Sequence, residues 1–239
     1  MSATNGSRSD GGALLRHEWP HWLVLLGMFG ASAWAWGRVT PPIPTHWNIR
    51  GEVDGYGGRF EGLLLVPLIA AGLYVMLLVL PRIDPGRANY ASFAGPYAVL
   101  RYALTVMMAG MHGLLLATAL GYPVDMGRWI PVGVGALLVL LGNILGKVRP
   151  NYFVGIRTPW TLASARSWEK THRLGGRLFV LGGAGMIVAA LVRQPWVFVV
   201  MGVYGAVALV WMFAYSWREW RADTDRVPVT GTRPASEER

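Results

Sequence analysis

The sequence has no cysteine and few charged residues, and both absences narrow the classes of protein that it can represent. None of its 239 residues is Cys, which excludes disulfides, thiol catalysis and cysteine-ligated zinc. Charged residues make up 15% of the chain, against about a quarter in an ordinary soluble domain. Hydrophobic residues make up 53%. This composition excludes a soluble enzyme, a disordered chain and a disulfide-stapled secreted domain.

Acidic residues and lysine are also missing from six long apolar stretches. A membrane-spanning helix needs roughly 20 mainly apolar residues, and these stretches are about that long. Tryptophan and tyrosine cluster at their ends, as in the aromatic belts at membrane surfaces. The fold class that we predict is therefore all-α: a polytopic membrane protein with a bundle of about six transmembrane helices. The stretches are Trp19–Trp36, Gly62–Pro81, Tyr102–Tyr122, Trp129–Gly146, Leu174–Val192 and Pro195–Trp217.

The basic residues are distributed unevenly between the connections. Sixteen Lys and Arg lie in the two tails and in the connections after the second and fourth stretches, five lie in the other three connections, and Arg177 completes the 22. Because cytoplasmic segments are enriched in Lys and Arg, this asymmetry predicts that both termini are cytoplasmic. Topology thus accounts for most of the net charge of +9, and the expected partner is the lipid bilayer, with no direct nucleic-acid contact.

Two connections are long and chemically distinctive. The first, Gly37–Glu61, is predicted to lie outside the cell and combines prolines at its start with glycines near its end. The second, Lys147–Arg173, is predicted to lie inside and contains six basic residues but one acidic residue. From about Thr161 its pattern indicates a helix that lies at the membrane interface and continues into the fifth apolar stretch.

Both connections resemble the signatures of a known family. The segment His46–Arg59, HWNIRGEVDGYGGR, is similar to the signature of a small domain of unknown function in bacterial membrane proteins. The segment Gly142–Val180 resembles the core signature of the SdpI family, and proteins with both signatures in this order form the SdpI-like immunity group. The resemblance implies a multi-pass protein of the bacterial cytoplasmic membrane that gives immunity to a secreted, membrane-active peptide toxin. It also implies signalling through a transcriptional repressor held at the membrane.

These observations divide the chain into four parts: a cytoplasmic tail at 1–18, an N-terminal membrane domain at 19–96, an SdpI-like membrane domain at 97–217 and a disordered cytoplasmic tail at 218–239. A basic segment that meets anionic lipid would explain the Lys and Arg of the inner connection. It would not explain the density of aromatic, Asn, Pro and Gly residues, so we predict a structured binding site. Its candidate residues are Asn151, Tyr152, Gly155, Arg157, Thr158, Pro159, Trp160, Trp168, Thr171, His172 and Arg173.

The outer connection supplies a second set of candidate binding residues, whose carboxylates could contact a cationic segment of a toxin. They are His46, Trp47, Asn48, Gly51, Asp54 and Gly55. His46, Glu52 and Asp54 could also form a metal site. Pairing of the carboxylates with Arg50 and Arg59 is the simpler interpretation, and we predict neither a metal nor a cofactor.

Other polar residues also have a structural interpretation. The run from His17 to His21 matches the zinc-protease pattern H-E-x-x-H, but Pro20 disfavours the single helical face that this chemistry needs. We expect a helix to begin at Pro20 instead. His112 and Asn143 lie at membrane depth and are expected to form hydrogen bonds between helices, and Gly182–Gly185 to allow close helix packing.

The function that the sequence favours is an SdpI-like immunity and signal-transduction protein, which binds a toxin outside and a repressor inside and is not an enzyme. The alternative is a small transporter or lipid-handling protein, although ion-coupled transport is disfavoured because the apolar stretches contain no carboxylate. A membrane enzyme has little support, since no paired carboxylates or activated nucleophile lie at one depth.

Overall fold

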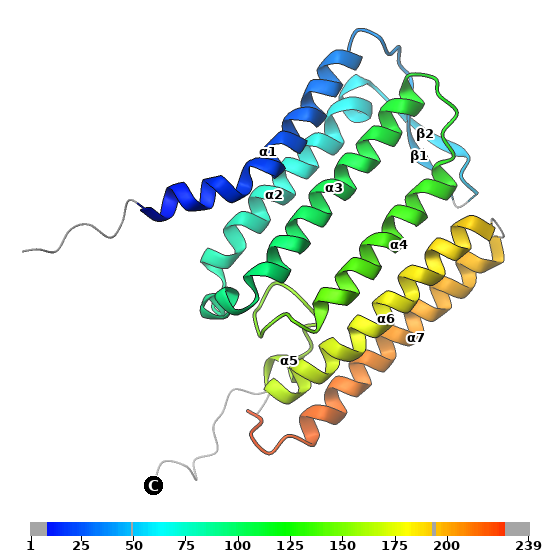
Figure 1. Ribbon diagram of the computed structural model, residues 1–239. Coiled ribbons are helices and arrows are strands. Elements are labelled where there is room, and N and C mark those ends of the chain that lie inside the picture. Colours follow the sequence, from blue (N-terminus) through cyan, green and yellow to red (C-terminus); the bar gives the residue numbers. More distant parts are fainter. Residues whose placement is uncertain (1–8, 49, 193–194, 228–239) are drawn as a thin grey trace, which may run out of the picture. The chain divides into compact units, whose positions relative to one another are not determined.

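Helices dominate the computed structural model, which describes residues 9–48, 50–192 and 195–227, with the backbone alone for 9–17 and 195 (Figure 1). The helices are α1 Ser9–Ala35, α2 Leu65–Ile83, α3 Ala94–Ala119, α4 Met126–Leu145, α5 Pro159–Leu162, α6 Ala165–Val192 and α7 Pro195–Arg221. A π-helical turn, Phe60–Leu64, leads into α2, and a 3₁₀ helix, Arg87–Phe93, leads into α3. Two short strands, β1 Ile43–Trp47 and β2 Val53–Gly57, lie between α1 and the π-helical turn.

Five helical segments in the described residues are long and apolar enough to cross a membrane. They are Phe60–Ile83, Arg87–Ala119, Met126–Leu145, Ala165–Val192 and Trp196–Arg221. Large apolar side chains remain exposed on them, such as Leu209 at 65% and Val210 at 70%, as lipid contact allows. The all-α, polytopic membrane fold is therefore confirmed. The first predicted stretch is also helical, within α1, but α1 is not among the five, so its crossing stays a prediction.

Contacts divide the chain into two compact units that interleave along the sequence. The first unit contains Met1–Asn48, Val53–Val75 and Leu104–Val124, and the second contains Ile49–Glu52, Met76–Ala103 and Asp125–Arg239. Helices α2 and α3 each contribute residues to both units. The predicted membrane domains are continuous segments, and their boundary at 96 and 97 falls inside α3.

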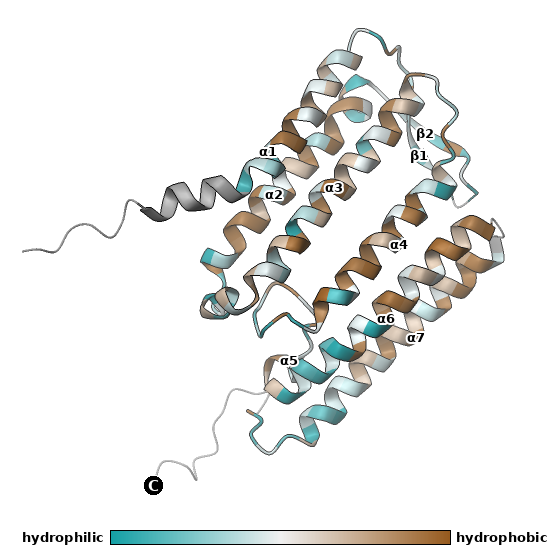
Figure 2. Ribbon diagram, viewed as in Figure 1, coloured by the Kyte–Doolittle hydropathy of each residue, from teal (hydrophilic) through white to brown (hydrophobic). Residues whose placement is uncertain are grey.

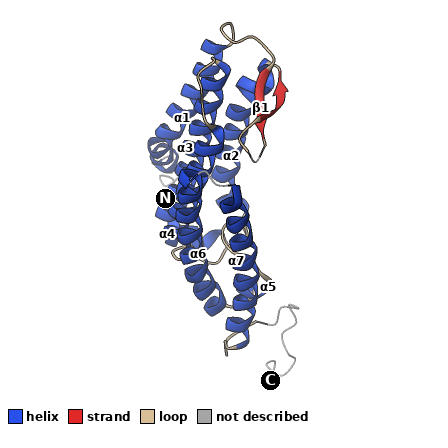
Figure 3. Ribbon diagram, turned by 90° about the vertical axis from the view of Figure 1, so that its right-hand side faces the viewer, coloured by secondary structure: helices blue, strands red, loops and turns tan. Residues whose placement is uncertain are grey.

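The core of the first unit joins α1, the outer connection, the π-helical turn and α3. It consists of Ala35, Val39, Ile43, Leu63 and Leu116. The strands β1 and β2, which we did not predict from the sequence, form an antiparallel hairpin (red in Figure 3). Gly62 lets this hairpin approach the π-helical turn, because a β-carbon there would lie 2.7 Å from Cγ2 of Ile43.

In the second unit, α4, α6 and α7 lie side by side (Figure 1). The backbones of α4 and α6 touch at two levels: a β-carbon on Gly142 would lie 2.5 Å from the carbonyl oxygen of Gly176, and one on Gly183 would lie 2.4 Å from that of Gly135. A β-carbon on Gly182 would lie 2.8 Å from the ring of Tyr204 in α7. The predicted role of the glycines of α6 in close helix packing is confirmed.

Helix α6 changes character along its length, with hydrophilic residues in its first turns and hydrophobic residues in its second half (Figure 2). The predicted helix that continues into the fifth apolar stretch is confirmed, and it begins at Ala165. Near this polar end, Glu219 of α7 lies 3.1 Å from Arg166 and 3.0 Å from Lys170. Charged pairs thus hold α6 and α7 together where the apolar packing ends.

Helices extend into both predicted tails. Helix α1 begins at Ser9 and contains Pro20, so the expected helix start at Pro20 is wrong. At the other end, α7 continues to Arg221, and the backbone N–H of Val227 donates to the carbonyl of Ala163 at 3.0 Å. Residues 222–227 therefore contact the α5–α6 junction. The rest of the two predicted tails, 1–8 and 228–239, lies outside the described residues.

Candidate functional site

The connection between α4 and α5, residues 146–158, is an ordered loop, and Asn151 closes its first turn. Its amide nitrogen donates to the carbonyls of Arg149 and Val154 at 2.8 and 2.9 Å. Its Oδ1 accepts the backbone N–H groups of Phe153 and Val154 at 3.0 and 2.6 Å. Asn151 is 1% exposed, and both polar atoms of its side chain are used inside the protein. The residue shapes the loop and offers nothing to a partner.

Two ring side chains of α6 hold the two ends of this loop. The indole N–H of Trp168 donates to the carbonyl of Val148 at 2.9 Å, and the backbone N–H of Ile156 donates to Nε2 of His172 at 3.0 Å. Nδ1 of His172 lies 2.8 Å from the carbonyl of Trp168. This geometry requires a neutral imidazole that carries its proton on Nδ1. Residues four apart lie on one face of a helix, so the two side chains point the same way. Both are buried.

Gly155 is the position where the loop passes closest to α6. Its φ is +115°, and a β-carbon there would lie 2.3 Å from Nε2 of His172. Only glycine satisfies both the conformation and the space. Because Gly155 lets the loop approach so closely, the N–H of the next residue, Ile156, lies directly against the imidazole.

The end of the loop is fixed by the start of α5. Thr158 is the N-cap: its Oγ1 accepts the N–H of Thr161 at 3.1 Å, and Oγ1 of Thr161 accepts the N–H of Thr158 at 2.9 Å. Pro159 follows at the first helical position, where its missing N–H has no cost. Oγ1 of Thr158 also bonds to Ser216 of α7 at 3.0 Å, which anchors this capping box to the helix pair.

The eleven predicted residues of the inner connection include buried, half-buried and exposed ones. Asn151, Thr158, Trp168, Thr171 and His172 are buried. Oγ1 of Thr171 finds no hydrogen-bond partner among the described residues. The exposed side chains include Tyr152, at 52%, and Arg157, which donates to the carbonyl of Tyr152 at 2.8 Å. We define the exposed rim of the loop as Tyr152, Phe153, Arg157 and Pro159.

The remaining predicted residues of this set lie beside the rim or apart from it. The ring of Trp160 is half-buried and packs edge-on against Phe213 of α7, with 4.6 Å between centroids. Arg173 is exposed and lies 3.4 Å from Glu169, four residues earlier in α6. Arg173 also borders a groove between α4 and α6, so it does not belong to the rim.

The predicted residues of the outer connection come together on the β1–β2 hairpin. Asp54 Oδ1 lies 2.5 Å from Nδ1 of His46, and both side chains are exposed. Gly55 faces His46 across the hairpin, where a β-carbon would lie 2.8 Å from Cβ of His46, and Gly51 makes the turn with a φ of +79°. Trp47 and Asn48, at the end of β1, are half-buried, and the next residue, 49, lies outside the described residues.

The metal interpretations find no support in the described part of the chain. Glu52 lies 3.0 Å from Arg50 and thus pairs with an arginine, as the simpler interpretation expects. In the zinc-like motif, Glu18 accepts the hydroxyl of Tyr74 at 3.1 Å and His21 bonds to Thr105 at 3.0 Å. The side chain of residue 17 is outside the described part. No group of three His, Cys, Asp or Glu that could hold a metal occurs among the described residues.

The two polar residues at membrane depth behave differently. His112 of α3 bonds to Ser32 of α1 at 3.0 Å and lies 3.3 Å from the carbonyl of Leu63, so the expected bond between helices is confirmed. Asn143 instead donates to Val139 of its own helix at 2.8 Å. The expectation for Asn143 is wrong, because its side chain is exposed on α4 and faces no other helix closely enough.

Comparison with known proteins assigns this region to a family. The family model described as "SdpI/YfhL protein family" matches residues 147–215, which contain most of the ordered loop, α5, α6 and most of α7. This segment is similar to the SdpI/YfhL protein family. A second model, a domain of unknown function called DUF1648, matches residues 23–71, which contain the hairpin. Both resemblances stated from the sequence are confirmed, and the SdpI segment carries the rim, the capping box and both ring side chains of α6.

A curated relative agrees with this assignment. The chain is 31% identical over 116 residues to a protein named "Immunity protein SdpI" from Bacillus subtilis (strain 168). The match covers 47% of this chain, and the chain spans 56% of that relative's length. No solved structure matches the chain. With five candidate spans and this relative, the protein is a multi-pass protein of the cell membrane.

One residue that fixes the loop lies outside the SdpI segment and was missed by the sequence analysis. Asp84, 1% exposed, follows α2 and accepts the hydroxyl of Tyr90 at 2.9 Å and the backbone N–H of Tyr152 at 3.1 Å. It also accepts the N–H of Gly86 at 2.6 Å. The signal in the sequence is the run Asp84-Pro85-Gly86, a turn pattern that follows an apolar stretch.

Proposed function

We propose that this protein is a membrane immunity protein, which protects a cell against a secreted, membrane-active peptide toxin. The observation that carries the proposal is the ordered loop between α4 and α5. Its buried residues use their polar atoms internally, and they hold an aromatic and basic rim in one fixed position. The name of the B. subtilis relative supports the same function. The proposal assigns no catalytic residue and no cofactor.

The two sides of the membrane have different tasks in this proposal. The hairpin outside exposes the carboxylate of Asp54, together with Glu52, and these groups would contact a cationic part of the toxin. Rings and an arginine are the side chains most enriched in protein interfaces, and the rim supplies both types. The rim would therefore bind the cytoplasmic partner, a transcriptional repressor. Four of the buried candidates, Asn151, Thr158, Trp168 and His172, then act as positioning residues, since their hydrogen bonds keep the rim in place.

The function can be tested in B. subtilis cells that lack their own SdpI protein. The full chain is expressed in these cells, which are then exposed to the toxin against which that relative protects, and both survival and membrane potential are recorded. We expect higher survival and a preserved potential compared with cells that carry an empty vector. The relative itself serves as the positive control. Unchanged survival, with the chain present in the membrane in amounts equal to the relative, would overturn the proposed function.

A further inference from the structure

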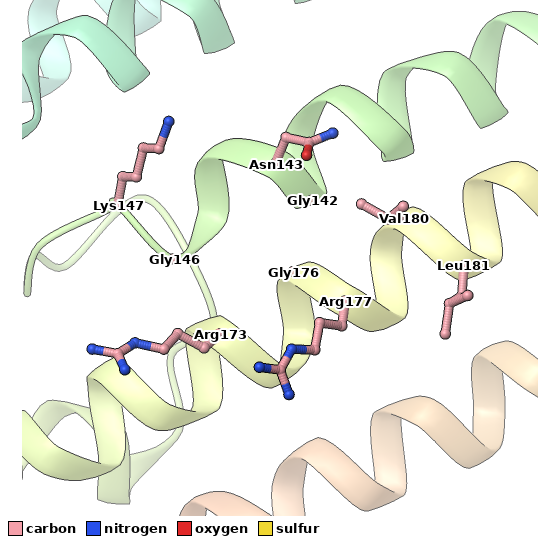
Figure 4. A pocket seen from close by; sticks show the side chains of 9 residues that line it. All are labelled: Gly142, Asn143, Gly146, Lys147, Arg173, Gly176, Arg177, Val180 and Leu181. Carbon is pink, nitrogen blue, oxygen red and sulfur yellow. The ribbon is translucent and has the colours of Figure 1, made fainter.

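An open groove of about 600 Å³ lies between the second half of α4 and the middle of α6 (Figure 4). Its floor is backbone, because Gly142 and Gly176 face each other there: a β-carbon on Gly176 would lie 2.6 Å from the carbonyl oxygen of Gly142. The two helices therefore meet without side chains that would fill the space above. The other residues that line it are Asn143, Gly146, Lys147, Arg173, Arg177, Val180 and Leu181.

Three of the lining residues are basic and none is acidic. Lys147 lies on the α4 side, and Arg173 and Arg177 lie one turn apart on α6, with their side chains extended in the same direction along the helix (Figure 4). Arg173 has a carboxylate 3.4 Å away, on Glu169, but Arg149 shares that carboxylate at 3.5 Å. Lys147 and Arg177 form no ion pair with the described residues. The groove thus carries uncompensated positive charge.

The position of this charge decides what kind of anion suits the groove. Arg177 belongs to the candidate span Ala165–Val192, and a cation at a membrane span is costly without a counter-charge. One turn further along α6 the lining becomes apolar, with Val180 and with Leu181, which is 63% exposed. The groove is therefore cationic at the end near the ordered loop and apolar toward the middle of the span. A soluble phosphate matches the first part alone, whereas a lipid matches both.

We propose that this groove binds the phosphate of an anionic glycerophospholipid, with an acyl chain lying along Val180 and Leu181. The guanidinium groups of Arg173 and Arg177 can each hold two phosphate oxygens, and Lys147 adds a point charge from the opposite side of the groove. Basic pockets between membrane helices bind such headgroups for this reason. Two faces of α6 thus have separate tasks, since Trp168 and His172 hold the ordered loop while Arg173 and Arg177 hold lipid. The inference does not depend on the proposed function.

Native mass spectrometry of the purified full chain tests this site. The protein in detergent is mixed with phosphatidylglycerol or with phosphatidylcholine of the same acyl chains, and retained lipid is counted; a parallel arm adds inorganic phosphate and records thermal stability. We expect one phosphatidylglycerol to be retained in preference to phosphatidylcholine. The double variant Arg173→Gln with Arg177→Gln should weaken this binding by about thirtyfold, at about 1 kcal/mol for each arginine.

A charge-matched control separates a local site from general attraction to anionic lipid. Arg82→Gln with Arg87→Gln also removes two exposed arginines, neither of which lines the groove, and should leave retention within about twofold of the parent. Equal retention of both lipids by the parent would overturn the inference. So would an Arg173 and Arg177 double variant that binds phosphatidylglycerol as the parent does, or an Arg82 and Arg87 control that loses as much binding. Stabilisation by inorganic phosphate without lipid preference would show a simple anion site and would also overturn it.

Discussion

The imidazole of His172 is stacked on the indole of Trp168, with 4.1 Å between ring centroids and 21° between ring planes. Each ring also bonds to the backbone of the α4–α5 loop, Trp168 to the carbonyl of Val148 and His172 to the N–H of Ile156. A single face of α6 therefore holds both ends of the loop. The loop's shape, and with it the position of the rim, depends on contacts that are buried below its surface.

Replacing Gly155 by alanine should disrupt this arrangement. The φ of +115° alone costs about 1–3 kcal/mol for a residue with a β-carbon, and that atom would also lie 2.3 Å from the imidazole. We expect a lower thermal midpoint in detergent and faster trypsin cleavage after Lys147 or Arg157. The matched control is Gly72→Ala in α2, where a β-carbon would meet no atom within 4 Å. Equal stability of the two variants would contradict the assigned role of Gly155.

Replacing Trp168 by phenylalanine keeps a stacked ring but removes the hydrogen bond to Val148. A buried carbonyl that loses its donor costs about 1–3 kcal/mol, so the variant should unfold at a lower temperature than the parent. Trp160→Phe provides the comparison, because the indole N–H of Trp160 makes no hydrogen bond with the described residues. If both variants lower the midpoint equally, the bond to Val148 contributes nothing specific.

Asp84 and Tyr90 should be coupled energetically, since the hydroxyl of Tyr90 donates to Asp84 at 2.9 Å in a buried site. The variants Asp84→Asn, Tyr90→Phe and the double variant form a cycle, with unfolding measured in the same detergent. We expect a coupling of about 0.5–3 kcal/mol, as for residues in one hydrogen-bonded network. Additive losses would mean that Asp84 holds the loop through the N–H of Tyr152 alone.

The sequence allowed the membrane class and the family to be predicted, because long apolar stretches and a long motif are local signals. It also marked Gly155, Trp168 and His172 as important. Their roles could not be read from it, since the bond from Ile156 to His172 joins residues 16 apart along the chain. Asp84 was missed for the same reason: its contact with Tyr152 spans 68 residues. The hairpin was missed because the proline in β1 and the two glycines in β2 disfavour a strand.

The predicted topology can be tested with single cysteines, because the chain contains none. Glu52→Cys lies in the hairpin turn and Ala165→Cys at the start of α6, and both positions are exposed. The charge asymmetry predicts that a membrane-impermeant thiol reagent labels Glu52→Cys in intact cells and Ala165→Cys only after the cells are opened. The reverse labelling pattern would mean that the termini lie outside.

Toxin survival of cells that carry a rim variant tests the central claim most directly. The double variant Tyr152→Ala with Arg157→Ala removes two exposed side chains whose loss leaves the buried residues intact. Tyr122→Ala with Arg87→Ala makes the same chemical change at exposed positions elsewhere and serves as the control. With all proteins at equal abundance in the membrane, we predict that the rim variant loses protection while the control protects as the parent does. A rim variant that protects fully would contradict the account.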